Sequence, residues 1–101
     1  MKLFIDTSAM NTAKVAVEID GKRFEKTSES KIMKSQMVLP MIEEILRERK
    51  RKLTDITAIT VATGPGSFTG LRVGATVANA LGYLLDIPVN GKMALVIPTY
   101  T

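Results

Sequence analysis

Two stretches near the start of the chain show hydrophobic patterns that are typical of β-strands. Residues 3–8 form a compact apolar run, and residues 13–19 alternate with the period of two expected of a strand with one buried face. In the second stretch we expect inward positions at Ala13, Val15, Val17 and Ile19, and outward positions at Lys14, Ala16 and Glu18. The dipeptide Asp20-Gly21 favours a two-residue hairpin turn, so residues 22–27 should return as a third, antiparallel strand.

The pattern changes to that of a helix between residues 31 and 52. Apolar residues recur there at spacings of three and four, which places them on one helix face: Met37, Val38, Met41, Ile42, Ile45 and Leu46. Ser28 or Ser30 is available as the N-cap. Because Pro40 has no amide hydrogen, we predict a break or a bend in the helix just before it.

The second half of the chain predicts a strand, a glycine-rich loop and another helix. Residues 56–63 are rich in β-branched side chains, as buried strands are, and lead through the loop at residues 64–70 into a helix over residues 69–85. A proline then prevents the helix from continuing, so residues 86–89 should be extended. The apolar run within residues 92–101 fits a helix or a strand, and the pattern does not decide between them.

The expected order of elements is β-β-β-α-β-α-β. This is the layout of a ribonuclease H-like α/β domain, with a mixed sheet of about five strands covered by helices. We find no internal repeat, no low-complexity segment and no linker in the sequence, so residues 1–101 should form a single domain.

Composition excludes several classes of function. The chain has no cysteine and no histidine, which rules out disulfides, thiolate metal sites and Ser-His or Cys-His catalysis. No stretch approaches the roughly eighteen apolar residues of a membrane-spanning helix, and the N-terminal apolar run is too short for a signal peptide. We therefore expect a cytoplasmic protein without membrane contact. The formal net charge of +4 favours an acidic partner or nucleic acid only weakly.

The glycine-rich loop is the most specific local motif. Gly64, Gly66 and Gly70 are spaced G-x-G-x-x-x-G, one residue longer than the dinucleotide fingerprint, and Leu71 stands where a Walker loop needs lysine. Two interpretations stay open: a tight strand-to-helix turn, or contact with an anion at the helix N-terminus. Under the second interpretation the candidate ligand contacts are Asp6, Thr7, Ser67 and Arg72.

Asp6 ends the first predicted strand, where ribonuclease H-like and actin-like folds place an acidic residue for metal or phosphate chemistry. A metal-dependent nuclease needs several further carboxylates that converge on that point. The other acidic residues belong to the hairpin, to the long helix or to loop edges. We therefore predict no metal site and no catalysis through Asp6.

Both predicted helices carry features that favour a partner interface. Gly70, Gly74, Ala78 and Gly82 are four apart and form a flat stripe, which calls for close packing because each interior glycine costs about 1 kcal/mol. The stripe packs either on the chain's own sheet or on another subunit, and the methionines of the first helix are either core or interface. The residues predicted for the interface are Met37, Val38, Met41, Ile42, Ile45, Gly70, Gly74, Val77, Ala78 and Leu81. If they face a partner, a bulky residue at Gly74 or Ala78 should abolish pairing and leave the fold largely intact.

Residues 47–52 read Arg-Glu-Arg-Lys-Arg-Lys and hold most of the excess positive charge. Cations at the end of a helix are favourable to its dipole without any ligand. The alternative is contact with a tRNA backbone, which predicts binding that weakens steeply as salt rises.

Taken together, these residues resemble the N-terminal domain of the TsaB (YeaZ) family. The similarity is carried by Phe-Ile-Asp-Thr-Ser at residues 4–8, by Ser-Gln-Met-Val-Leu-Pro-Met-Ile at residues 35–42, and most specifically by Gly-Pro-Gly-Ser-Phe-Thr-Gly-Leu-Arg-Val-Gly at residues 64–74. It covers residues 1 to about 91. Family members usually continue into a second domain of similar fold, which this sequence lacks, so we expect a truncated or minimal form.

The resemblance implies an actin-like, ribonuclease H-like fold and a protein that is not itself an enzyme and holds no cofactor. It implies a scaffold in the synthesis of threonylcarbamoyladenosine on tRNA, which pairs through its two helices with the catalytic paralogue TsaD or with itself as a homodimer. A TsaE-like ATPase joins that complex, and tRNA is contacted indirectly. The alternative is a small nucleotide-binding or tRNA-binding actin-like domain.

Overall fold

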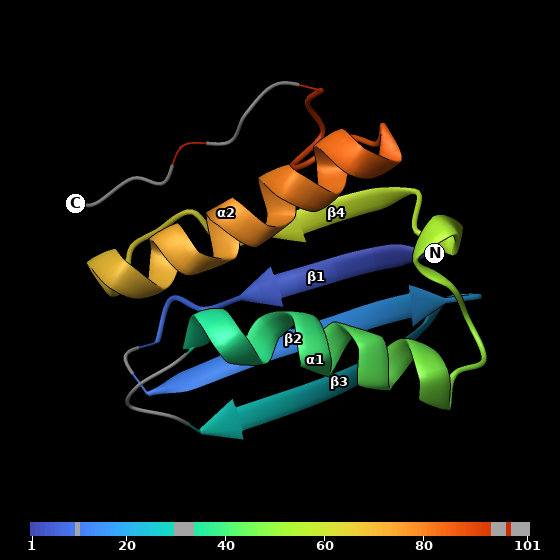
Figure 1. Cartoon of the computed structure of the whole chain (residues 1–101), viewed down its shortest axis with the longest axis horizontal. Helices are drawn as coiled ribbons and strands as arrows, with labels where there is room; N and C mark the ends of the chain where they lie inside the picture. The colour runs from blue at the N-terminus through green and yellow to red at the C-terminus, as the bar shows by residue number, and fades with distance from the viewer. Residues whose placement is uncertain (10, 30–33, 94–96, 98–101) are drawn as a thin grey trace.

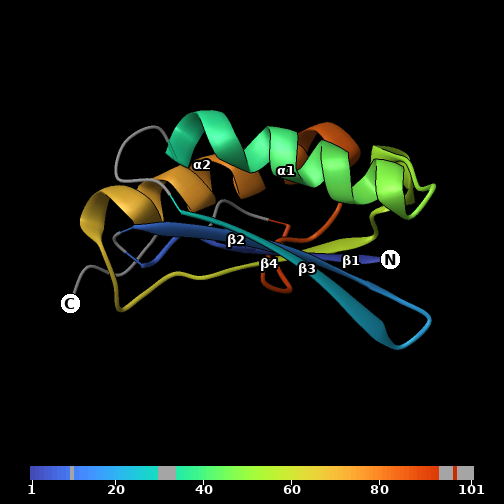
Figure 2. The ribbon, with the colours of Figure 1, turned by 90° about the horizontal axis from the view of Figure 1, so that it is seen from below.

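The computed structural model describes residues 1–9, 11–29, 34–93 and 97. The elements along the chain are β1 (Lys2–Asp6), β2 (Thr12–Ile19), β3 (Lys22–Glu29), α1 (Lys34–Glu48), a short 3-10 helix η1 (Leu53–Asp55), β4 (Ala58–Val61) and α2 (Phe68–Leu85). They form two layers, in which both helices cover the same face of one sheet and leave its other face bare of helices (Figure 1, Figure 2).

The sheet has four strands in the order β3-β2-β1-β4. The β1–β2 and β2–β3 pairs are antiparallel, and β4 runs parallel to β1. The predicted hairpin is confirmed, with positive φ at both Asp20 (52°) and Gly21 (79°), as a two-residue turn of this kind requires. The predicted fifth strand is reduced to one bridge between Val89 and Ile59, because Asn90 and Gly91 both adopt positive φ and turn the chain away.

The short segment after α2 pairs with the outer edge of β4. The Ile59 amide donates to the Pro88 carbonyl at 3.0 Å, and the Asn90 amide donates to the Ile59 carbonyl at 2.8 Å. The Asn90 side chain then takes the place of a strand backbone, because its Oδ1 accepts from the Val61 amide at 2.8 Å and its Nδ2 donates to the Val61 carbonyl at 3.0 Å.

The hydrophobic core lies between the sheet and the two helices. Its best-buried side chains, at most 3% exposed, are Leu3, Ile5, Val15, Val17, Ile59 and Val61 from strands and Val38, Ile42, Ile45, Leu71 and Ala78 from helices. Ala16 points outward as predicted, but it is buried as well. Ala16 does lie on the helix-free face, but Phe4 and Glu25 flank it on the neighbouring strands, and Arg23 covers the Phe4 ring at 4.4 Å. Larger neighbours therefore cover a small side chain.

Of the break or bend predicted before Pro40, the break does not occur, because α1 is one continuous helix that contains this proline. The Gln36 carbonyl would have accepted the hydrogen bond that Pro40 cannot donate. Both residues are exposed, so water can bind that carbonyl instead.

The predicted N-cap of α1 is not found in the described part of the chain. Ser28 belongs to β3, and Ser30 lies outside the described residues.

The second helix begins where the sequence predicts. The Ser67 hydroxyl accepts from the Gly70 amide at 3.3 Å as the N-cap, and the helix ends at Asp86 in a left-handed conformation. Most of the undecided run at residues 92–101 lies outside the described residues. In the part of the chain that is described, no helix is long and apolar enough to span a membrane.

Candidate functional site

The glycine-rich loop holds the end of β1 against the start of α2. The Ser67 amide donates to the Ser8 carbonyl at 2.8 Å, and the buried Thr7 hydroxyl donates to the Gly70 carbonyl. A Cβ atom added to Gly66 would lie 2.7 Å from the Cβ and from the carbonyl oxygen of Ser8. Glycine is required at position 66 by this close approach, which supports the tight-turn interpretation of the loop.

Three amides around the start of α2 are engaged within the chain. The Gly70 amide donates to the Ser67 hydroxyl at 3.3 Å, and the Leu71 amide donates to the Ser67 carbonyl at 2.9 Å. Together with the Ser67 amide bound to Ser8, these groups would have to give up their partners before they could hold a phosphate.

Asp6 and Thr7 lie on opposite sides of the sheet, as neighbouring residues of an extended chain do. Thr7 is buried beneath α2, whereas Asp6 is exposed and accepts hydrogen bonds from the amide and the hydroxyl of Ser8. Asp6 borders a hollow of about 200 Å³ on the helix-free face, whose described lining includes neither Ser67 nor Arg72. Ser67 and Arg72 therefore do not share this hollow with Asp6. Among the described residues, no group of three or more Asp, Glu, His or Cys could hold a metal ion.

The small-residue stripe of α2 packs on the chain's own sheet and on the segment that follows the helix. A Cβ on Gly74 would lie 2.5 Å from the Thr7 hydroxyl oxygen, and one on Gly82 would lie 2.5 Å from a methyl of Val89. Gly70 and Ala78 are buried as well. A bulky residue at Gly74 or Ala78 would disrupt the core, so the prediction that such a change leaves the fold intact was wrong.

Most of the apolar side chains predicted for an interface belong to the core of this chain. The two helices together cover one whole face of the sheet, so each needs a wide apolar arc, and the buried members are Val38, Met41, Ile42, Ile45, Ala78 and Leu81. Met37 and Val77 are half-buried at the borders of these arcs. Direct contact with a partner therefore calls for other residues of the same helices.

The sequence interpretation missed the outward side of α2. We use the name outer face of α2 for seven exposed or half-buried residues of this side: Arg72, Val73, Thr76, Val77, Ala80, Tyr83 and Leu84. Tyr83 is 86% exposed and Leu84 is 74% exposed, and residues 73–85 include no charged side chain. Large apolar groups on an uncharged surface are typical of a binding site. The absence of charge over those residues was the signal that could have identified this face.

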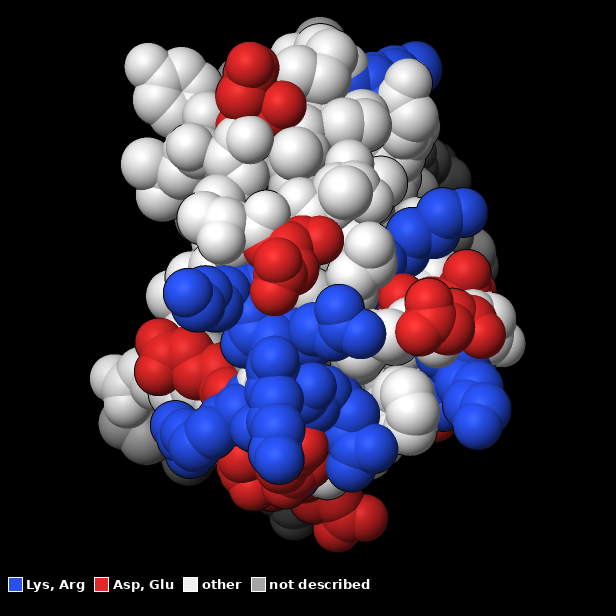
Figure 3. Space-filling model, turned by 90° about the vertical axis from the view of Figure 1, so that its right-hand side faces the viewer, with Lys and Arg blue, Asp and Glu red and all other residues white. Residues whose placement is uncertain are grey.

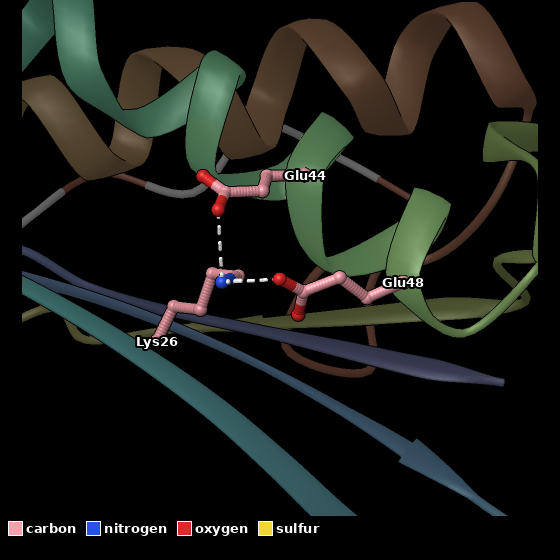
Figure 4. A network of polar contacts seen from close by, with 3 residues as sticks. All are labelled: Lys26, Glu44 and Glu48. Atoms are coloured by element: carbon pink, nitrogen blue, oxygen red, sulfur yellow. Dashed lines mark hydrogen bonds and ion pairs between the residues drawn. The ribbon is translucent and has the colours of Figure 1, made fainter.

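The outward side of α1 is different, because charged residues dominate it. Glu43, Glu44, Arg47 and Glu48 are exposed there. Lys26 of β3 reaches two of them, with its Nζ atom 3.1 Å from a Glu44 carboxylate oxygen and 2.8 Å from one of Glu48 (Figure 4). The hydrogen bonds to Glu48 and then Glu44 raise the pKa of Lys26.

A second ion pair lies on the helix-free face. Arg23 donates a hydrogen bond of 2.7 Å to Glu25, and this bond lowers the pKa of Glu25.

The basic run lies where α1 ends. Arg47 is in the last turn, the next four cations follow the helix, and Lys22 projects from the β2–β3 hairpin nearby. We call these residues the basic surface; they are Lys22, Arg47, Arg49, Lys50, Arg51 and Lys52. Figure 3 shows Lys and Arg side chains gathered in one area of this end of the molecule, with acidic side chains at its margins. A shallow depression of about 300 Å³ lies between the hairpin and the run.

Comparisons with known proteins agree with these observations. Residues 28–93 match the family model described as "TsaD: tRNA N6-adenosine threonylcarbamoyltransferase". Two curated relatives are named tRNA threonylcarbamoyladenosine biosynthesis protein TsaB. The one from Escherichia coli is 41% identical over 61 residues, which are 60% of this chain and 26% of the relative. The one from Haemophilus influenzae is 37% identical over 87 residues, which are 86% of this chain and 36% of the relative.

The fold comparison leads to the same proteins. The solved structure of YeaZ from Pseudomonas aeruginosa matches with a TM-score of 0.82 and 32% identity, over 87% of this chain and 41% of that one. This likeness confirms the predicted ribonuclease H-like α/β class. The chain spans less than half of the length of each of these three relatives.

Proposed function

This chain belongs to the TsaB (YeaZ) group of the family whose model is described as TsaD, tRNA N6-adenosine threonylcarbamoyltransferase, and from that premise we propose that it is a non-catalytic scaffold for a TsaD-like subunit. The two proteins would act together in the synthesis of threonylcarbamoyladenosine on tRNA in the cytoplasm. The outer face of α2 makes the contact. The observation that carries this proposal is the exposure of Tyr83 and Leu84 within residues 73–85, which include no charged side chain.

The energetics favour Tyr83 and Leu84 as the anchors of the contact. Burying a leucine side chain fully contributes about 1.5–3 kcal/mol, and tyrosine is among the residues that most often dominate binding energy at interfaces. The half-buried Val73 and Val77 extend the apolar surface toward the start of α2. Because Thr76 and Ala80 are small and exposed, a partner helix can approach this face closely.

The first helix contributes to the same contact from one side. It packs against α2 on the sheet, and its largest exposed apolar residue is Leu39. Glu43 and Glu44, which lie about one turn after Leu39, fit the polar rim that surrounds the apolar centre of an interface. In this proposal both helices face the partner, with α2 at the centre and α1 at the margin.

The arrangement of the candidate ligand residues is compatible with a scaffold. Ser67 and Arg72 do not line the hollow beside Asp6, and the amides of Ser67, Gly70 and Leu71 are bound within the chain. When no TsaD-like subunit is present, the same apolar face pairs two copies of this chain. A TsaE-like ATPase joins the complex with the catalytic subunit, which contacts tRNA.

Light scattering on the purified chain, alone and mixed with the TsaD-like protein from the same source, tests the proposal. We expect a homodimer that yields to a heterodimer on mixing. The double variant Tyr83→Glu, Leu84→Glu should weaken both associations by roughly a hundredfold or more, because charge replaces the two anchors.

The matched control is the double variant Lys22→Gln, Arg51→Gln, which lowers the net charge by the same two units on the basic surface. This control should pair as the wild type does. A wild-type chain that stays monomeric in both samples, or a Tyr83→Glu, Leu84→Glu variant that pairs normally, would contradict the proposal.

A further inference from the structure

The basic surface takes no part in the pairing proposed above, and we propose that it binds the sugar-phosphate backbone of RNA. The choice of RNA among polyanions rests on the proposed function, whereas the binding surface itself rests on the charges and contacts of this chain. The cations involved come from two elements that are distant in sequence, the end of α1 with the residues after it and the β2–β3 hairpin.

The acidic residues near the basic surface have partners of their own or stand apart from the run. Glu48 is the one acid within residues 47–52, and it binds Lys26 at 2.8 Å (Figure 4). Asp55 accepts a hydrogen bond from the Lys52 amide at 2.8 Å, and Asp20 belongs to the hairpin turn. The ion pairs found among the described residues involve Arg23 and Lys26, so none of them neutralises a cation of the basic surface.

The backbone holds these cations in fixed positions. The Lys50 amide donates to the Arg47 carbonyl at 3.1 Å, and the Arg51 amide donates to the Leu46 carbonyl at 2.9 Å. This pair of bonds is the Schellman arrangement, which closes the end of a helix. Residues 50 and 51 are therefore parts of an ordered helix end, so binding would cost little conformational entropy in the backbone.

Lys50 also occupies a backbone conformation that disfavours lysine. Its φ is 55°, and the other non-glycine residues with positive φ in the described chain are Asp20, Asp86 and Asn90, of the types that tolerate this region. Glycine is the usual residue at this point of a Schellman arrangement. A lysine there costs about 1 kcal/mol relative to glycine. This cost favours a role for the Lys50 charge in binding.

Arg49 and Lys22 border the depression from opposite sides. The Arg49 guanidinium lies 4.3 Å from the centre of the Phe24 ring, which holds it flat against the protein. Lys22 comes from the hairpin side, together with Asp20, and Lys50 and Arg51 lie on the other side beside Glu48, whose carboxylate is bound to Lys26. Phosphates that follow one another along a nucleic acid strand fit a shallow depression that has cations on both sides. The helix dipole accounts for Arg47, but its effect does not extend to Arg51 and Lys52.

A membrane is the less suitable partner for this surface. Protein segments that bind the lipid interface combine cations with large exposed apolar side chains. Among the described residues, the large exposed apolar side chains are Leu39, Tyr83, Leu84, Met93 and Ile97, and none of these belongs to the basic surface. A repeated phosphate chain matches a surface that is rich in cations and carries no large exposed apolar side chain.

Fluorescence anisotropy of a labelled, unmodified tRNA transcript with the full chain tests this inference. Between 50 and 200 mM salt, the affinity should fall by roughly 500-fold if about five phosphates are neutralised. The Lys22→Gln, Arg51→Gln variant should lower the slope of log K against log salt by about 2, one for each lost phosphate contact. The Tyr83→Glu, Leu84→Glu variant makes the same change in net charge and should keep the wild-type slope.

Several results would overturn the inference: no tRNA binding at 50 mM salt, binding that does not change with salt, an equal loss in both double variants, or stronger binding to phosphatidylserine vesicles than to tRNA. The two variants also separate this inference from the proposed function. If tRNA binding fails and pairing with the TsaD-like protein persists, only the proposal that the basic surface binds RNA is wrong. If pairing fails and salt-dependent tRNA binding persists, the scaffold proposal is wrong and this inference stands.

Discussion

The two helices lie side by side on the same face of the sheet, and they differ in what they expose. The outward side of α1 carries Glu43, Glu44, Arg47 and Glu48, two of which are bound by Lys26 of the chain's own β3. The outer face of α2 carries Tyr83 and Leu84 in a stretch without charge. Both inward faces are apolar because both helices cover the same core. The fold therefore determines the inward residues, and the outward residues distinguish a solvated helix from one suited to a partner.

Each helix also contains a residue with low helix propensity, and only one of these two residues is required by the packing of the fold. Gly74 of α2 leaves no room for a side chain between the helix and the sheet. Pro40 of α1 lies on the exposed side, where no packing contact depends on it. The same low helix propensity thus has a structural reason in α2 and none that we find in α1.

The largest expected effect is on the stability of the fold, through the packing of α2 on the sheet. The substitution Gly74→Leu should lower the free energy of unfolding by about 3 kcal/mol, because the new side chain meets Thr7 and Val61. Urea denaturation measures the change. The control is Ala80→Leu on the outer face of α2, which should alter stability little. If the two substitutions were equally tolerated, α2 would not pack on the sheet as described.

An effect of opposite sign is expected at Pro40. The substitution Pro40→Ala should raise the free energy of unfolding by about 2 kcal/mol, since alanine restores the amide and improves helix propensity while freeing the unfolded chain somewhat. Thermal unfolding followed by circular dichroism measures this gain. Gln36→Ala, one turn earlier on the same exposed side, is the control and should change little. A loss of stability in Pro40→Ala would mean that the proline has a structural role.

The smallest effect concerns the ion pairs of α1. Glu48 and Glu44 raise the pKa of Lys26 in the folded state, so these contacts stabilise the fold at pH values below the ordinary lysine pKa of 10.5. The stabilisation is lost as the pH rises through the higher pKa of the folded state. We expect Lys26→Met to be less stable than wild type at pH 7, by less than the Pro40 effect, and the two proteins to converge above pH 10.5. A difference that persists there would indicate packing rather than charge.

Local patterns predicted most of this fold. The alternation in β2, the Asp20-Gly21 turn and the glycine-rich loop before α2 are recognisable because each depends on residues close together in sequence. The continuity of α1 through Pro40 and the burial of Ala16 depend on solvent and neighbours that the local pattern does not contain. The fifth strand was overestimated because Asn90 and Gly91 turn the chain after one bridge.

The candidate site was harder to predict than the fold. An apolar helix face in the sequence does not reveal whether a sheet of the same chain will cover it, so Val38, Ile42 and Ile45 were assigned to an interface and lie in the core. The reliable signal was the lack of charge in residues 73–85, since a fully solvated side would normally carry some. The glycine loop was ambiguous for a related reason, because only the position of Ser8 shows why Gly66 must be glycine.

The two edges of the sheet bear on how this protein behaves at high concentration. An unpaired strand edge can recruit the same strand from another molecule and start aggregation. The edge strand β3 carries Lys22, Arg23, Glu25, Lys26 and Glu29, and charges of this kind oppose such recruitment. The edge strand β4 has no charged side chain. Its protection therefore depends on the backbone of Pro88 and Asn90, which pairs with Ile59, and on the side-chain amide group of Asn90, which binds the backbone of Val61. Solubility thus rests at that edge on a segment of a few residues after α2.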